Sequence, residues 1–188
     1  DSAVAVFPFA DGWIGAHVAK DGSTLLASGD LPEGTRIEPV RQGPCTGEVR
    51  LALGGVDALE DGMLFVVAAA NGDNVAAVGP LPDGSAWHIR IADEGNNFRQ
   101  EELCAFSVVY LPYRTPGLVG GWVAADGRVL AGTGSFGVRP TAPGRYELSV
   151  LGAADAADGI LLVQIAQMAP DGVEDNAIAW AYDPAANG

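Results

Sequence analysis

The side chains best suited to chemistry are few in this sequence and stand far apart. His17 and His88 are the two histidines, and neither sits in a metal-ligand spacing. We expect each to be a surface or half-buried strand residue. The run Gly132-Thr-Gly-Ser-Phe-Gly137 spells a dinucleotide-binding pattern. However, the strand-like Val138-Arg-Pro140 follows where a helix N-terminus would have to bind pyrophosphate. Ser135 also lacks the glycine two residues before it that a hydrolase nucleophile needs. No catalytic set can be named, so we expect a protein that is not an enzyme.

Two loops gather oxygen atoms that a calcium ion could use. Asn71-Gly-Asp-Asn74 and Asp171-Gly-Val-Glu-Asp-Asn176 fall at equivalent places in the chain, and Asp73, Asp171 and Asp175 are the weak candidate metal ligands. Calcium takes about six to eight oxygens, and neither loop matches the known calcium loop of about twelve residues. The same residue types also form ordinary turns. We therefore expect no cofactor, with bound calcium as the alternative.

The two cysteines, Cys45 and Cys104, suggest a disulfide. The second half of the chain has no equivalent of Cys45, and it also lacks the segment that would correspond to the one carrying Cys104. Because both are absent together, we predict that they are bonded to each other, which an extracellular compartment would permit. Two buried free thiols are the alternative.

Exposed tryptophan side chains could form a flat platform that stacks against sugar rings. Trp13 and Trp122 are the candidates for such a platform. Large aromatic residues in β-proteins more often fill the core, since each buries about 150–250 Å². A carbohydrate-binding or adhesion module, with a glycan as partner, is therefore the alternative function.

These residues lie in a chain that repeats itself. Residues 12–29 return as residues 117–134, with identical residues at Gly15 and Gly120, Asp21 and Asp126, and Gly22 and Gly127, among others. An internal sequence repeat of this kind indicates a repeated structural unit. Asp-Gly pairs recur along the chain as turn signals, because glycine adopts the positive φ that tight turns require.

Between the turns lie short segments rich in β-branched, aliphatic and aromatic residues, which predict strands. In the first unit the predicted strands are 13–18, 24–27, 48–53, 63–69, 86–91 and 105–111; in the second they are 118–123, 128–131, 145–151, 160–167 and 177–182. The sequence therefore predicts an all-β fold of two tandem antiparallel β-sandwich units, Ig-like or jelly-roll-like. Residues 1–10 would be an N-terminal strand, 11–114 the first unit, and 115–188 a second unit lacking its closing strand.

The N-terminal strand resembles the strand that the second unit lacks. Val4-Ala-Val-Phe-Pro-Phe9 is similar to Val108-Val-Tyr-Leu-Pro-Tyr113. An unpaired sheet edge is a template for another chain, and donor strands bind such edges by main-chain hydrogen bonds. We therefore expect an assembly strand that completes the second unit of a neighbouring copy. Its residues are Val4, Ala5, Val6, Phe7 and Phe9.

Composition narrows the partners further. The formal net charge is −14, with a single lysine, so neither nucleic acid nor an anionic membrane is an expected partner. No apolar run approaches the roughly 20 residues of a membrane-spanning helix, so we expect no membrane insertion. The first residues carry no signal-peptide pattern, and we expect that any such peptide has been removed or never existed.

Residues 121–150 resemble a pattern found in extracellular β-rich modules of bacteria and phages. The matching positions are Asp126-Gly127, Phe136, Val138, Arg139 and Gly144-Arg-Tyr146. The resemblance implies a surface, fibre or adhesion component and brings no catalytic residues. We therefore expect a non-catalytic structural protein, extracellular or on a cell or virion surface. Copies of it would self-assemble by strand complementation into a filament, fibre or surface layer.

Overall fold

The computed structural model describes residues 13–19, 21–28, 31–40, 47–69, 74–93, 105–152, 159–166 and 178–181. Within these ranges the secondary structure consists of twelve β-strands and no helix. Every strand pairing is antiparallel. The predicted all-β class is confirmed.

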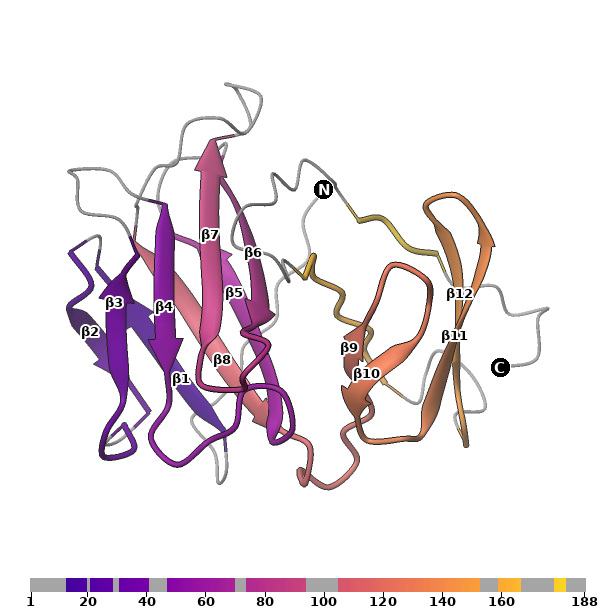
Figure 1. The fold of residues 1–188 in the computed structure, drawn as a ribbon, viewed down its shortest axis with the longest axis horizontal. Helices are drawn as coiled ribbons and strands as arrows, with labels where there is room; N and C mark the ends of the chain where they lie inside the picture. Colours follow the sequence, from indigo (N-terminus) through magenta and orange to yellow (C-terminus); the bar gives the residue numbers. More distant parts are fainter. Residues whose placement is uncertain are drawn as a thin grey trace.

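Eight strands of the first unit form two four-stranded sheets that lie face to face (Figure 1). The first sheet has the order β2 (Thr24–Ala27), β1 (Ile14–Val18), β8 (Phe106–Pro112) and β5 (Gly62–Ala68). The second has the order β3 (Arg36–Pro39), β4 (Glu48–Ala52), β7 (Trp87–Asp93) and β6 (Asn74–Pro80). The strands β5 and β6 are therefore edge strands, one in each sheet.

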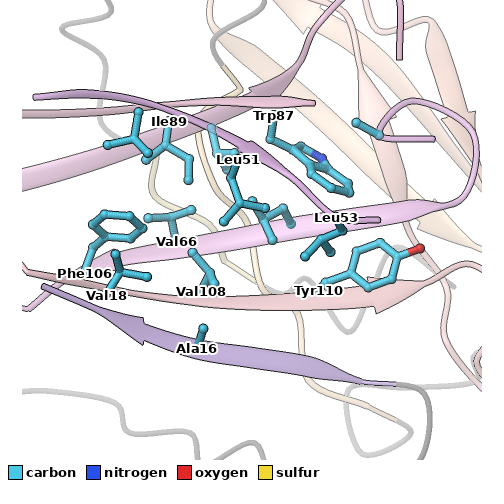
Figure 2. Packing of buried hydrophobic residues seen from close by; sticks show 14 of the residues in the cluster. Ala16, Val18, Leu51, Leu53, Val66, Trp87, Ile89, Phe106, Val108 and Tyr110 are labelled. Atoms are coloured by element: carbon cyan, nitrogen blue, oxygen red, sulfur yellow. The ribbon is translucent and has the colours of Figure 1, made fainter. Parts of the chain in front are cut away.

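Alternating side chains place the core between these sheets. In β4, Val49 and Leu51 are 1% exposed, whereas Arg50 between them is exposed. This is the period of a strand with one buried face. Figure 2 shows Leu51, Trp87 and Ile89 of the second sheet facing Val66, Phe106 and Val108 of the first. The rings of Trp87 and Tyr110 meet in a tilted arrangement, 5.5 Å between centroids, which is a favourable geometry for aromatic pairs.

The second unit contributes two separate hairpins. The strands β9 (Gly121–Val123) and β10 (Val129–Gly132) form one two-stranded sheet, and β11 (Phe136–Ala142) and β12 (Arg145–Val150) form another. Both lie to one side of the paired sheets (Figure 1). Among the described residues of this unit, Trp122 is the one that belongs to the buried core; Leu118, Leu130, Ala131 and Ala166 are partly buried and pack against that core. The described residues of this unit do not form a second pair of stacked sheets.

The repeat in the sequence is a repeat in the structure. In the β1–β2 turn, Ala19 N donates to Ser23 O (2.8 Å) and Gly22 N to Ala19 O (2.9 Å). In the β9–β10 turn, Ala124 N donates to Arg128 O (2.9 Å) and Gly127 N to Ala124 O (2.9 Å). Gly22 and Gly127 have φ values of 83° and 84°. The β9–β10 hairpin is therefore the structural counterpart of the β1–β2 hairpin.

Some predicted strands are absent and others were missed. The described residues of the predicted strands 160–167 and 177–182, namely 160–166 and 178–181, have no strand structure, so those predictions are wrong for these residues. Conversely, β3, β6 and β11 were not among the predicted strands. The segment of β6, Asn74-Val-Ala-Ala-Val-Gly-Pro80, has small residues and a terminal glycine and proline, which are poor strand signals.

Candidate functional site: an assembly surface on the second unit

Most residues predicted to carry a function lie outside the described residues. These are the assembly strand Val4, Ala5, Val6, Phe7 and Phe9, the cysteines Cys45 and Cys104, and the acids Asp73, Asp171 and Asp175. Within the described ranges, no group of three or more histidine, cysteine or acidic side chains could hold a metal ion.

Of the two tryptophans of the predicted sugar platform, Trp122 is buried and Trp13 is half-buried. Trp122 is 7% exposed and its Nε1 donates to the carbonyl oxygen of Gly62 (3.3 Å), so its ring is part of the core and offers no face to a ligand. Trp13 is half-buried, while Trp180 is 57% exposed. Trp122 is buried because it fills the space between the second unit and β5. In the sequence repeat Trp122 corresponds to His17. His17 lies on β1, and its Nδ1 is hydrogen-bonded to Ser107 Oγ of β8 (3.0 Å).

The edge of β9 differs from that of its counterpart β1. The strand β1 has two neighbours, because it pairs with β2 on one side and over its whole length with β8 on the other. The strand β9 pairs with β10, and no other strand of the described residues pairs with it. The place that β8 takes beside β1 is therefore unfilled beside β9 within the described part of the chain. An open edge of this kind can accept a strand.

The β11–β12 hairpin adds apolar surface to this unpaired region. Tyr146 and Leu148 of β12 are 48% and 38% exposed, and Leu151 beyond the strand is 74% exposed. Tyr146 is held at its tip, where its hydroxyl donates to the carbonyl oxygen of Ala125 (2.6 Å). Isolated two-stranded sheets are marginally stable in water. The second unit thus presents two hairpins with open edges and apolar side chains that would gain stability from a partner.

A polar hollow lies on the outer face of the β3–β4–β7–β6 sheet. It has a volume of about 560 Å³, and its lining includes Arg36, Arg50, Asp57, Asp83 and Ser85. The polar groups bind one another: Arg50 Nη2 donates to Ser85 Oγ (2.7 Å), and Ser85 Oγ donates to Asp83 Oδ1 (2.6 Å). The hydrogen bonds from Ser85 hold the pKa of Asp83 below its usual value. The hollow is therefore lined by a hydrogen-bonded turn network in which these polar groups satisfy one another.

A buried charged cluster lies on the same sheet. Glu48, His88 and Arg90 are 2%, 4% and 7% exposed although they alternate with the core residues of β4 and β7. Glu48 is the register partner of Arg90, and its Oε2 lies 3.8 Å from His88 Nε2. The sequence predicted a surface or half-buried histidine, so the prediction for His88 is wrong. The pairing of Glu48 with Arg90 depends on strand register, which the local sequence does not specify.

Comparison with known proteins identifies no relative: no family model, no curated protein and no solved structure matches this chain. Among the described residues no helix is long and apolar enough to cross a bilayer. The assignment of function therefore depends on the geometry of the second unit.

Proposed function

We propose that this chain is a non-catalytic structural protein whose copies assemble by β-strand addition into a filament, fibre or surface layer. In this proposal the second unit becomes a second β-sandwich when a strand from a neighbouring copy pairs with β9. The assembly is placed outside the cell or on a cell or virion surface, as the resemblance of residues 121–150 implies. Its partners are copies of itself, without nucleic acid and without membrane insertion.

The observation that carries the proposal is the contrast between β1 and β9. The two strands share a hairpin with matching turn hydrogen bonds, yet β8 pairs with β1 and no described strand takes the same place beside β9. Residues 4–9 resemble residues 108–113, most of which lie in β8. A segment similar in sequence to β8 is therefore present, and no described strand takes the β8-like position in the second unit.

The direction of assembly follows from this pairing. A donor strand at one place and an acceptor edge at another make a heterologous, head-to-tail contact, which propagates unless the rotation closes a ring. Main-chain hydrogen bonds would provide affinity, and the alternating side chains of residues 4–9 would select the register. The exposed side chains of Tyr146 and Leu148 lie in the same unit and would lose apolar exposure on assembly.

The test compares the full chain with a variant lacking residues 1–9, by size-exclusion chromatography with light scattering. We expect the full chain to form large species and the truncated chain to remain monomeric. A synthetic peptide of residues 1–9 should bind the truncated chain and slow hydrogen exchange of the β9 amides. A matched peptide with Val6→Pro, which removes a backbone donor, should not. A truncated chain that assembles like the full chain contradicts the proposal.

A further inference from the structure

The neighbouring edges of β5 and β6 present main-chain polar groups that no strand of the described residues covers. The two strands are successive in the chain, and each is the outer strand of its sheet. Val66 of β5 offers both its N–H and its C=O on this side, and Ala76 and Val78 of β6 offer a C=O and an N–H. Two donors and two acceptors thus lie along one side of the sandwich. Such edges require protection against strands of other chains.

One side chain from the second unit satisfies three of these four groups. Gln164 Oε1 accepts from Val66 N (2.9 Å), and Gln164 Nε2 donates to Val66 O (2.6 Å) and to Ala76 O (3.1 Å). The primary amide therefore binds the edge of β5 as a strand residue would, while it also reaches the opposite sheet. A carboxamide can do this because it carries an acceptor oxygen and two N–H donors.

The main chain beside Gln164 completes the contact. Val78 N donates to the carbonyl oxygen of Ile165 (3.3 Å), and Ala166 packs against the core. Ile160 and Val163 are 84% and 46% exposed and contribute little burial, whereas Leu161 is half-buried. Gln164 supplies three of the four hydrogen bonds that attach this segment to the edges. In the sequence repeat the segment is the counterpart of β5 itself, since Asp158-Gly-Ile-Leu161 matches Asp61-Gly-Met-Leu64.

We propose that the paired edges of β5 and β6 form a peptide-binding slot that selects a glutamine carboxamide. Residues 160–166 of the same chain occupy this slot as an edge guard. While the guard is bound, the first unit cannot accept a strand from another copy. Strand addition is then confined to the second unit; this last consequence rests on the proposed function, whereas the slot and its occupant do not.

The test is Gln164→Glu, a change of nearly equal shape. A carboxylate retains the acceptor but loses both donors, and it places a negative oxygen against the carbonyls of Val66 and Ala76. We expect hydrogen exchange of the Val66 and Val78 amides to become at least about tenfold faster. The amide of Ile89, in the central strand β7, serves as the internal reference and should be unchanged. Ile160→Ala on the same segment is the matched control and should leave all three rates unchanged.

In a second measurement, an added peptide takes the place of the guard segment. A peptide of residues 159–166, Gly-Ile-Leu-Leu-Val-Gln-Ile-Ala, added to the Gln164→Glu chain should slow exchange at Val66 and Val78 again. The same peptide with glutamate in place of glutamine should have no effect. The proposal is overturned if exchange at Val66 and Val78 does not change in Gln164→Glu, or if Ile89 accelerates by the same factor. The monomeric or assembled state of the chain lacking residues 1–9 is a separate readout, so the two proposals can fail independently.

Discussion

Trp122 shows at the level of one residue how the second unit is attached to the first. Its indole is buried in the core, and its Nε1 donates to Gly62 O at the start of β5. The sequence could identify Trp122 as a large aromatic residue on a strand, but burial depends on what packs against it. Because the first unit supplies that neighbour, a platform residue and a core residue look the same in the sequence.

Trp122→Phe should therefore reduce the free energy of unfolding by about 1–3 kcal/mol, through the lost hydrogen bond and the space left by the smaller ring. Urea denaturation followed by circular dichroism measures this. Trp180→Phe, at a residue 57% exposed, is the control and should stay within about 0.5 kcal/mol of the parent. Equal effects of the two substitutions would show that Trp122 is not part of the core.

Tyr110 gives the molecule a sensitivity to alkali. Burial raises the pKa of Tyr110 to about 12, with a smaller contribution from Asp61, and burial also raises the pKa of Tyr113. In the unfolded chain a tyrosine titrates near 10, so the unfolded state loses the proton first and stability falls as the pH rises. The contribution of Tyr110 is fully present below about pH 10 and is lost as the pH approaches about 12.

We expect the melting temperature to fall steeply between about pH 10 and 12. Phenolate absorbance should show late titration of two tyrosines in the folded chain. Tyr110→Phe removes one of these groups, so the remaining loss of stability in this pH range should be smaller. If the parent and Tyr110→Phe show the same pH dependence, Tyr110 does not control it.

At the level of the element, the β9–β10 hairpin depends on glycine where two backbones approach closely. A Cβ on Gly121 would overlap the carbonyl oxygen of Ala131 in β10, whereas a Cβ on Gly137 in β11 would meet at most Ser149 Oγ at an ordinary 3.5 Å. The two glycines therefore form a matched pair, both in strands and with different surroundings.

Gly121→Ala should destabilise the hairpin by about 1–3 kcal/mol, as in other overpacked sites. This loss of stability should be measurable as faster hydrogen exchange of the β10 amides. Gly137→Ala should leave exchange in both hairpins within about a factor of two, a change of about 0.4 kcal/mol. A Gly121→Ala chain with unchanged exchange would mean that the hairpin can relax around the added methyl group.

Most strands of the first unit could be predicted from their own residues. Glu48-Val-Arg-Leu-Ala52 alternates polar and apolar residues, and its core face matches the structure. Residues 160–166 are rich in aliphatic residues like β5 but form no strand, because a strand also needs a neighbour, and the nearest edges bind Gln164 through its side chain. The repeat also predicted that the second unit lacks a closing strand, and among the described strands only β10 pairs with β9. The position of the two hairpins of this unit could not be predicted, because it is decided by the whole fold.

At the level of the whole molecule, the net charge of −14 opposes the association of copies. Copies that approach one another repel, and the range of the repulsion shrinks from about 30 Å at 0.01 M salt to about 8 Å at 0.15 M. We therefore expect assembly to strengthen as sodium chloride is raised between these concentrations. Light scattering measures the effect, and the chain lacking residues 1–9 is the control, monomeric at both. Assembly that weakens with salt would indicate attraction between opposite charges instead.

Because Gln164 binds the β5 and β6 edges, these edges can be covered only after Gln164 has been synthesised. Gln164 lies 98 residues after Val66, the residue it binds. The sandwich cannot form before β8 ends at Pro112, 52 residues before Gln164. A ribosome adds about 5–20 residues per second, so the β5 and β6 edges stay unguarded for roughly 3–10 s. During this interval neighbouring nascent chains on one messenger could pair through these edges. Spacing between ribosomes, or a chaperone that covers exposed strands, would therefore determine how much of the protein reaches its guarded form.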